Sequence, residues 1–246
     1  MLENRTAVVT GAAGGIGSAL TAGLLSAGAT VIAIDLTAAA LDKLRESTKN
    51  HPQLVTVAAN ITDEAESARI AAEVGKTSER VDILVNCAGL FPPCPFEKMT
   101  FAEWRRIMAV NLDGVFLMTS AILPLMKNGG FGRIINIGSS SYFQGTPNYV
   151  NYVAAKAGVI GFTRSLAREV GVYGITANVI APGLTSTQFV LDSASEAFLE
   201  NRRLQRSIQR HQYPKDVVGT ILFLCSEASD FVTGQTIVVD GGAVFN

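Results

Sequence analysis

The sequence has few of the residues that usually hold metal ions or form disulfides. It contains 3 cysteines and 2 histidines among 246 residues, and Cys87, Cys94 and Cys225 form no CxxC pair. Structural zinc sites and disulfide frameworks need closely spaced clusters of such residues. We therefore predict neither a metal site nor a disulfide.

An excess of charge of either sign is also absent. The formal net charge is -1 and no basic run occurs, so the chain has no general attraction for nucleic acid or anionic lipid. No apolar run approaches the roughly 18 residues needed to cross a membrane. The opening MLENRTAVVTGAAGG lacks the features of a signal peptide. We expect a cytoplasmic protein without nucleic-acid or membrane partners.

Short runs rich in β-branched residues alternate with longer helical patterns along the chain. Continuous apolar strands separated by helices are typical of a parallel sheet covered on both faces, and right-handed crossovers then give a doubly wound, Rossmann-like fold. We predict one α/β domain over residues 1–246, with a mostly parallel central sheet flanked by helices. The expected strands are residues 6–10, 30–34, 54–58, 82–86, 133–137, 175–180 and 236–240, with a long helix over about 101–126.

The segment 183–212 is less regular and rich in serine and threonine. It follows the carboxyl end of a predicted strand, where ligands bind in sheets of this kind. We predict a substrate-covering loop with one or two short helices. The alternative is a surface excursion without a role in binding.

A glycine-rich turn, TGAAGGIG at residues 10–17, follows the first predicted strand. Gly11 permits a tight turn, and Gly15 and Gly17 allow close approach of the backbone to a ligand. The helix that begins there directs its N–H groups and its dipole at an anion. Such turns also serve packing alone, but the position between a strand and a helix predicts a bound dinucleotide.

Asp35 ends the second predicted strand. A carboxylate at this position can accept hydrogen bonds from the adenosine ribose hydroxyls and would repel a 2′-phosphate. Ala12, Ala13 and Leu36, the neighbouring residues, supply no cation that could offset this repulsion. The sequence therefore favours NAD over NADP as cofactor.

The stretch YVAAK places Tyr152 and Lys156 four residues apart in a predicted helix. Residues at this spacing share a helix face. A tyrosine base at neutral pH needs its pKa lowered from about 10 to about 7, which corresponds to about 4 kcal/mol. One cation at about 4 Å supplies roughly that energy. We therefore expect Lys156 to lower the pKa of Tyr152, unless the pair is only a solvated helix face.

The ordered set of motifs resembles the short-chain dehydrogenase/reductase family over essentially the whole chain. The motifs are TGAAGGIG at 10–17, NCAG at 86–89, VNLDGVF around residue 111, GRIINIGSSS at 132–141, YVAAK at 152–156, NVIAPG at 178–183 and TGQTIVVDGG at 233–242. The resemblance implies a catalytic set of Asn111, Ser139, Tyr152 and Lys156. In it Ser139 positions the substrate oxygen and Tyr152 exchanges the proton. The resemblance also implies a homotetramer.

In this resemblance, Lys156 also holds the nicotinamide ribose, and Asn111 anchors a water that connects Lys156 to solvent. Three positions depart from the family pattern: Asn60 stands where an aspartate is common, Cys87 where a second asparagine is usual, and Thr185 where an aliphatic residue is usual. The implied cofactor site comprises Gly11, Gly14, Gly15, Ile16, Gly17, Asp35, Asn60, Ile61, Asn86, Ala88, Gly89, Tyr152, Lys156, Pro182, Gly183, Thr185 and Thr187.

The residues expected around the substrate are mostly apolar and aromatic. They are Leu90, Phe91, Pro92, Ser141, Tyr142, Phe143, Tyr149, Leu184 and Phe189. Such a set suits a compact ring-bearing alcohol better than a sugar or a polyanion. The stretch from GTPNYVNYVAAK to NVIAPGL resembles family members that oxidise pyridoxal. FPPCPFEKMTFAEWRR with GRIINIGSSSYF resembles members that act on phenylethanol-type alcohols.

We therefore predict a NAD-dependent oxidoreductase that transfers a hydride between the nicotinamide and a small ring-bearing alcohol or carbonyl, with Tyr152 as general acid or base. The alternative enzyme is a 3-oxoacyl-thioester reductase that uses NADPH, against which Asp35 and the near-neutral charge argue. Outside the dehydrogenases, an NAD-binding sensor or a methyltransferase could share the glycine turn, but neither needs Ser139, Tyr152 and Lys156.

Overall fold

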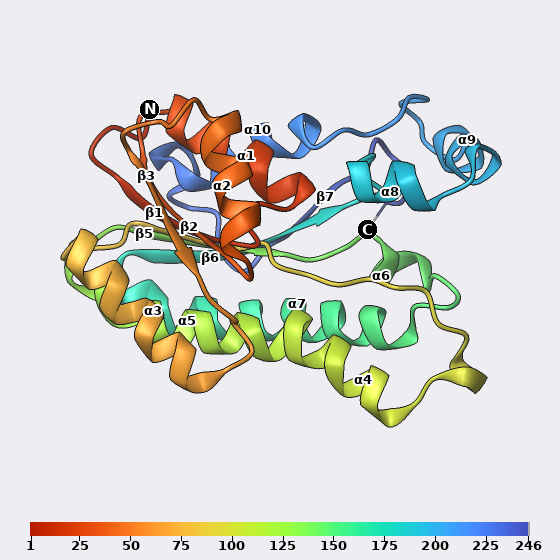
Figure 1. The fold of residues 1–246 in the computed structure, drawn as a ribbon, viewed down its shortest axis with the longest axis horizontal. Helices are drawn as coiled ribbons and strands as arrows, with labels where there is room; N and C mark the ends of the chain where they lie inside the picture. The colour runs from red at the N-terminus through yellow and green to blue at the C-terminus, as the bar shows by residue number, and fades with distance from the viewer. Residues whose placement is uncertain (246) are drawn as a thin grey trace.

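The computed structural model describes residues 1–245. Its seven strands form one parallel sheet in the order β3-β2-β1-β4-β5-β6-β7 (Figure 1). Each predicted strand is present within two residues of its expected bounds, which confirms the doubly wound α/β fold. The strands are β1 Thr6–Thr10, β2 Thr30–Asp35, β3 Leu54–Ala58, β4 Ile83–Asn86, β5 Gly132–Ile137, β6 Ile175–Pro182 and β7 Thr236–Val239.

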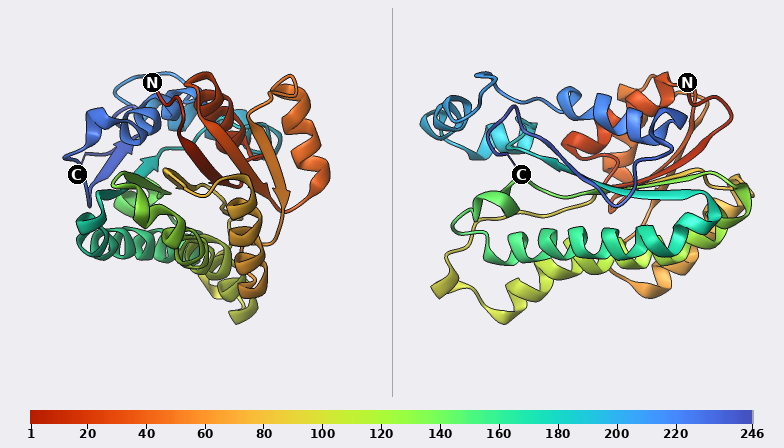
Figure 2. Two further views of the ribbon diagram at one scale, coloured as in Figure 1. Left: turned by 90° about the vertical axis from the view of Figure 1, so that its left-hand side faces the viewer. Right: turned by 180° about the vertical axis from the view of Figure 1, so that it is seen from behind.

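The helices form a layer on each face of the sheet (Figures 1 and 2). One layer contains α1, α2 and α10, and the other contains α3, α5 and α7. The helices are α1 Gly15–Ser26, α2 Ala38–Ser47, α3 Glu64–Thr77, α4 Phe101–Met108, α5 Gly114–Met126, α6 Ser141–Gln144, α7 Val150–Val170, α8 Gln188–Ser193, α9 Glu196–Leu204 and α10 Lys215–Cys225. The short turns are η1 Phe96–Lys98, η2 Ala109–Asp113, η3 Lys127–Gly129, η4 Gly171–Tyr173 and η5 Glu227–Ser229.

Apolar cores on both faces of the sheet explain why its inner strands are continuous apolar runs. Leu20, Leu24 and Ile221 of α1 and α10 pack on one face, whereas Met118 and Ile122 of α5 pack on the other. The inner strands β1, β4, β5 and β6 bury every side chain, and strands covered on both faces lose the alternation of apolar and polar residues.

Helix starts follow local capping signals in the sequence. The Thr37 side chain accepts from the Ala40 N–H at the start of α2, and Asp63 caps α3 in the same way. At α4, Thr100 and Glu103 form a reciprocal capping box. These side chains satisfy N–H groups that have no partner within the helix.

The expected long helix is continuous from Phe101 but contains the π-helical turn η2 between α4 and α5. By length and composition alone, the helix Phe101–Gly129 could cross a membrane, although no apolar run of that length was expected. The same composition arises in a core helix, and α5 buries Met118, Ile122 and Met126 against the sheet.

The strand order reverses beside β1, which pairs with β2 on one side and β4 on the other. The chain therefore leaves β1 and β4 toward opposite layers. In open α/β sheets, ligands bind in the crevice formed at the carboxyl ends of such strands. The glycine turn after β1 and the NCAG motif after β4 both lie at this crevice.

The core predicts a measurable cost for truncating a central side chain. Leu84 of β4 is fully buried in the core on the face of the sheet covered by α3 and α5. Leu84→Ala should lower the free energy of unfolding by about 2–5 kcal/mol, because it leaves a cavity. Urea denaturation would measure this, with the half-exposed Leu204→Ala as control. A loss no larger than that of the control would contradict the prediction.

Candidate active site

A cavity of about 800 Å³ opens at the carboxyl edge of the sheet. It is lined by segments that follow β1, β2, β3, β4, β5 and β6, together with residues of α7, α8 and α9. Sixteen of the seventeen predicted cofactor residues line it; Asn86 is the exception. The cavity therefore brings together in space the motifs that the sequence shows only as an ordered series along the chain.

The glycine turn forms a backbone surface that side chains would fill. Gly11 has a φ of 62°, in the left-handed region that favours glycine. A Cβ on Gly15 would lie 2.3 Å from Thr187 Cγ2, and one on Gly17 would lie 2.0 Å from the Gly11 carbonyl oxygen. Backbone N–H groups at the start of α1 remain open to the cavity, so this surface fits a dinucleotide pyrophosphate.

The Asp35 carboxylate is held by backbone groups at the edge of the same cavity. The Ala13 N–H donates to Oδ2 at 2.9 Å, and the Leu36 N–H donates to Oδ1 at 2.8 Å. A carboxylate has about four acceptor positions, so each oxygen can accept a further hydrogen bond. This arrangement fits the two hydroxyls of an adenosine ribose.

Asn86 does not line the cavity, and its side chain lies behind the cavity wall, so its predicted side-chain contact with a cofactor is not supported. It is 2% exposed, and its Nδ2 donates to Thr119 Oγ1 at 3.1 Å and to Asn136 Oδ1 at 2.8 Å. Asn136 in turn donates to Thr163 Oγ1 at 2.8 Å. The Asn86 amide nitrogen thus joins β4 to α5 and to β5, whereas its Oδ1 has no partner among the described residues.

Ser139 lies just after β5 and is nearly buried. The Ser141 hydroxyl donates to Ser139 Oγ at 2.7 Å, and the Ser141 backbone N–H donates to the same atom at 3.2 Å. A hydroxyl oxygen has two acceptor positions and one proton. Because Ser141 fills the acceptor positions, the Ser139 proton is left for the phenol of Tyr152 or for a substrate oxygen.

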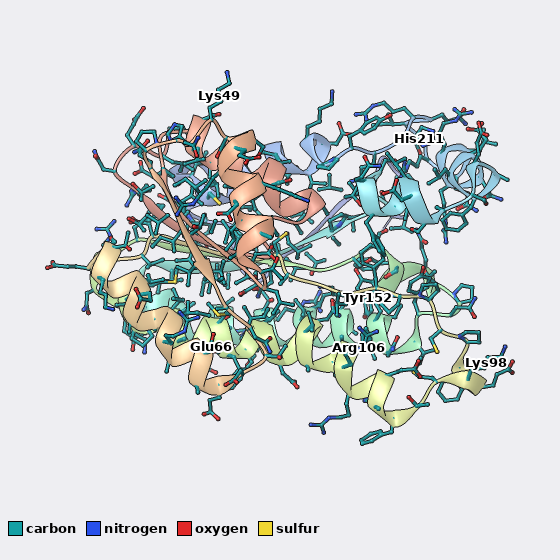
Figure 3. The ribbon with its side chains drawn as sticks, in the orientation of Figure 1. Lys49, Glu66, Lys98, Arg106, Tyr152 and His211 are labelled. Atoms are coloured by element: carbon teal, nitrogen blue, oxygen red, sulfur yellow. The ribbon has the colours of Figure 1, made fainter. Side chains whose placement is uncertain are left out.

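Tyr152 extends from the first turns of α7 into the cavity (Figure 3). Burial raises the pKa of its phenol to about 12, and hydrogen bonding with Ser139 offsets only part of this rise. Lys156 is not among the groups that shift this pKa, so the expectation that it lowers the pKa of Tyr152 does not hold for the protein by itself, where burial dominates. At neutral pH the phenol carries its proton, which is the form that can protonate a carbonyl oxygen.

Lys156 is 3% exposed, and its Nζ donates to the Ile137 carbonyl oxygen at 2.7 Å. Nζ lies 5.7 Å from the centre of the Tyr152 ring. Burial lowers the pKa of the ammonium group to about 8. The cation is therefore held beside the phenol in a place where a phenolate would be stabilised.

Asn111 lies in the π-helical turn η2 and is fully buried. Its Nδ2 donates to the Leu90 carbonyl at 2.8 Å and to the Ile107 carbonyl at 3.0 Å, and its Oδ1 accepts from the Leu90 N–H. A Cβ on Gly89 would lie 2.9 Å from Asn111 Oδ1 and 3.7 Å from Lys156 Nζ. Gly89 and Lys156 line the cavity, Asn111 lies directly behind them, and its hydrogen bonds to Leu90 fix the loop that follows NCAG.

Aromatic side chains gather around Tyr152 at the other end of the cavity. The Phe91 ring centre lies 6.1 Å from that of Tyr152 and 5.6 Å from that of Phe189. The ring centre of Tyr149 lies 6.2 Å from that of Tyr152. Of the expected substrate residues, the following line the cavity: Leu90, Phe91, Pro92, Ser141, Tyr149, Leu184 and Phe189.

Tyr142 and Phe143 do not line the cavity, which corrects their predicted role. They lie in the single turn of helix α6, where their rings pack edge to face with centres 4.9 Å apart. Tyr142 is 42% exposed. Helical side chains at adjacent positions point in different directions, so α6 turns Ser141 and Gln144 toward the cavity instead.

The sequence analysis missed several polar and charged residues that line the cavity. They are Arg106, Gln144, Thr146, Arg202, Gln205 and Arg206. Three of them come from α9 and the residues just after it, inside the predicted substrate-covering segment. The spacing of Arg202 and Arg206, four residues apart, was a signal for one shared face.

A model of the family described as enoyl-(acyl carrier protein) reductase matches residues 11–244. The chain is 36% identical to a 3-oxoacyl-(acyl-carrier-protein) reductase of Thermotoga maritima, over 99% of this chain and 99% of that protein. It is 35% identical to an acetoacetyl-CoA reductase of Allochromatium vinosum, over 97% of this chain and 98% of that protein.

A crystal structure from Brucella melitensis, described as a short-chain dehydrogenase/reductase of the glucose/ribitol dehydrogenase type, superimposes with a TM-score of 0.94 at 31% identity. The match covers 100% of this chain and 98% of that one. The chain belongs to the short-chain dehydrogenase/reductase family. The resemblance drawn from the motifs is thereby confirmed.

Membership of the short-chain dehydrogenase/reductase family makes the protein an oxidoreductase that acts on CH–OH or carbonyl groups. It excludes the methyltransferase alternative and favours an enzyme over a sensor. The NAD(P) cofactor of the family fits the glycine surface and the Asp35 carboxylate described above.

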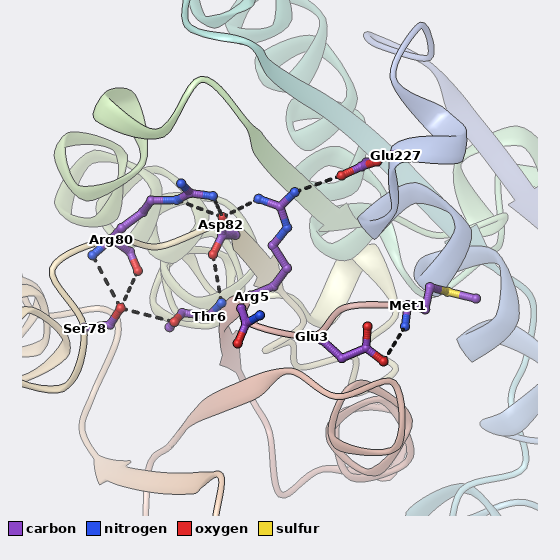
Figure 4. Close-up of a pocket in the computed structure, with 9 residues that line it drawn as sticks. Met1, Glu3, Arg5, Thr6, Ser78, Arg80, Asp82 and Glu227 are labelled. Carbon is purple, nitrogen blue, oxygen red and sulfur yellow. Dashed lines mark hydrogen bonds and ion pairs between the residues drawn. The ribbon is translucent and has the colours of Figure 1, made fainter.

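A second cavity, of about 520 Å³, lies at the amino ends of β1 and β4 (Figure 4). It is therefore at the opposite edge of the sheet from the cofactor cavity. Its charged groups pair with one another. Arg5 bonds Asp82 at 3.0 Å and Glu227 at 3.1 Å, and Arg80 also bonds Asp82. The Thr6 N–H donates to Asp82 as well. This cluster joins strand starts and leaves no unpaired charge for a ligand.

The two hydrogen bonds from Ser141 predict a role in orienting Ser139. Ser141→Ala should lower kcat for carbonyl reduction by about 3- to 10-fold, because one bond that directs the Ser139 proton is lost. Ser141→Thr, which keeps a hydroxyl, should restore most of the rate. Ser140→Ala is the control, since the Ser140 side chain forms no hydrogen bond with the described residues. Equal kcat in Ser141→Ala and wild type would contradict this role.

Titration of Lys156 predicts the pH dependence of carbonyl reduction. Its ammonium is charged below a pKa of about 8, and only the charged form stabilises the phenolate left when Tyr152 gives up its proton. The value of kcat/KM for reduction should therefore fall as the pH rises through about 8. Lys156→Arg, which stays charged, should remove this break, whereas exposed Lys43→Met should not. A wild-type rate that stays level up to about pH 10 would exclude Lys156 as the titrating group.

Proposed function

We propose that the protein reduces the keto group of a 3-oxoacyl thioester, using NADH, with Tyr152 as proton donor. The observation that carries this proposal is the convergence of Ser139, Tyr152 and Lys156 on one wall of the cofactor cavity. The names of the relatives, 3-oxoacyl-(acyl-carrier-protein) reductase and acetoacetyl-CoA reductase, support the thioester over the ring-bearing alcohol first expected.

The chemistry divides between the cofactor and the chain. A bound reduced nicotinamide supplies the hydride that becomes the new C–H bond of the alcohol. Ser139 holds the substrate oxygen through its free proton, and Tyr152 transfers its proton to that oxygen. Lys156 stabilises the phenolate that remains, until solvent returns a proton. Overall, the carbonyl group takes up one hydride and one proton and becomes an alcohol.

The protonation of Tyr152 supports reduction as the direction at neutral pH. A phenol whose pKa is raised to about 12 by burial holds its proton and can donate it. Oxidation of an alcohol needs the phenolate instead, and a charge on the bound oxidised nicotinamide would have to lower this pKa first.

The preference for NADH over NADPH is supported by Asp35. Its carboxylate is fixed by two backbone N–H groups at the ribose end of the cavity and forms no ion pair with a residue among 1–245. A 2′-phosphate placed there would meet an uncompensated negative charge.

A ring-bearing alcohol or ketone is the second candidate substrate. Phe91 and Tyr149 pack against Tyr152, and Phe189 packs against Phe91, with ring centres 5.6 to 6.2 Å apart; these rings would pack on an aromatic substrate in the same way.

Oxidation of NADH and of NADPH with acetoacetyl-CoA, and of NADH with acetophenone, would test both candidates. We expect NADH-linked reduction of acetoacetyl-CoA. Tyr152→Phe should lower that rate by about 10²- to 10⁴-fold and leave NADH binding intact. Tyr142→Phe, a tyrosine outside the cavity, is the matched control.

Each other outcome identifies one error. Turnover of acetophenone alone would replace the thioester by the second candidate. Turnover with NADPH alone would show that Asp35 does not select the cofactor. A Tyr152→Phe variant as active as wild type would contradict the assignment of the proton donor.

A further inference from the structure

Arg202 of α9 is a cation that faces the substrate end of the cavity without an acidic partner among residues 1–245. Its guanidinium donates to Gln144 Oε1 at 3.2 Å and to Gln205 Oε1 at 3.3 Å. It also lies over the Phe198 ring, 5.3 Å from the ring centre. Neutral amides and an aromatic ring position the charge but do not neutralise it.

The neighbouring arginines have different partners. Arg203 pairs with Glu200 at 2.6 Å, and Arg210 pairs with Asp216 at 2.6 Å. Arg206 is 5% exposed and donates to the carbonyl oxygens of Leu184 and Arg210. Arg202 therefore differs from Arg203 and Arg210, which form ion pairs, and from Arg206, which is buried: it is half-buried, lines the cavity and forms no ion pair with a described residue.

The position of Arg202 connects it to the reacting centre. Gln144 belongs to α6, so the Arg202–Gln144 hydrogen bond joins α9 to the segment that follows Ser139. The charge of Arg202 acts on Tyr149 by lowering the pKa of its hydroxyl against the larger effect of burial. Tyr149 in turn packs against Tyr152. Tyr149 thus lies between Arg202 and the proton donor Tyr152.

The charges that line the cavity as a whole are unbalanced toward the positive. The basic lining residues are Arg106, Lys156, Arg202 and Arg206, and among residues 1–245 the single acidic one is Asp35. Asp35 lies at the ribose end, where backbone N–H groups already hold it. A half-buried guanidinium without an acid is the donor that proteins use to bind a carboxylate or a phosphate in a bidentate manner.

We propose that Arg202 binds an anionic group of the substrate, a carboxylate or a phosphate, while the keto group lies against Ser139 and Tyr152. This inference rests on the proposed function only in that the substrate is a carbonyl compound reduced in this cavity. Gln144 and Gln205 hold the guanidinium in place for the anion. The anion comes either from a free carboxylate on the acyl chain or from a phosphate of the thioester carrier.

Two matched substrate pairs would separate these sources. The first pair is 5-oxohexanoate and its methyl ester; the second is acetoacetyl-CoA and the neutral acetoacetyl-N-acetylcysteamine thioester. Arg202→Gln should raise KM for the charged member of the relevant pair at least about tenfold, which is about 1.4 kcal/mol. It should change the neutral member by less than about twofold and leave kcat unaltered. Arg202→Lys should restore part of the loss.

Arg203→Gln is the control, because Arg203 is on the same helix but pairs with Glu200. An equal loss on charged and neutral members would show that Arg202 only joins α9 to α6, and no change in either pair would exclude a role in binding. Both results overturn the inference. Selectivity in the oxoacid pair without turnover of either thioester would overturn the thioester proposal and leave the anion site standing.

If none of the four compounds is reduced, the same comparison is made by calorimetric titration of 5-oxohexanoate and of acetoacetyl-CoA into the NADH-loaded protein. Binding of either anion that weakens at least about tenfold in Arg202→Gln supports the inference. Binding that is absent in wild type, or equal in wild type and Arg202→Gln, overturns it.

Discussion

The hydrogen bond from Lys156 Nζ to the Ile137 carbonyl links the two elements that carry the chemistry. Ser139 follows β5 and Tyr152 projects from α7, so neither position is set by local structure alone. The bond joins the last residue of β5 to the helix face that bears Tyr152. Because the lysine is almost fully buried, its positive charge needs stabilisation by this carbonyl and by the phenolate that forms in the reaction.

The parts of this protein that depend on short-range patterns were predictable from the sequence. The strands, the glycine turn and Asp35 each occupy one local stretch, and parallel topology then brings their ends to one edge. The Ser139–Tyr152–Lys156 set came from the family resemblance, and the homotetramer and cytoplasmic location stay predictions. The fate of Asn86 was not predictable, since its partners Thr119 and Asn136 come from distant elements.

Two further differences between the structure and the sequence-based predictions have physical causes that residue spacing does not reveal. The pKa of Tyr152 depends on how much water reaches the phenol, and the spacing to Lys156 gives only the attraction between the two groups. The availability of Arg202 for an anion depends on whether folding places a carboxylate beside it. Arg203 and Arg210 cannot be distinguished from Arg202 in the sequence, yet each forms an ion pair after folding.

The π-helical turn that contains Asn111 changes the phase between α4 and α5. Successive residues of an α-helix are rotated by about 100°, and a π-helical turn accommodates about one extra residue. The apolar face of α5 can therefore lie flat on the sheet while α4, on the same continuous helix, directs Arg106 toward the cofactor cavity and Ile107 inward. A regular helix of the same length would rotate one of these two faces into solvent.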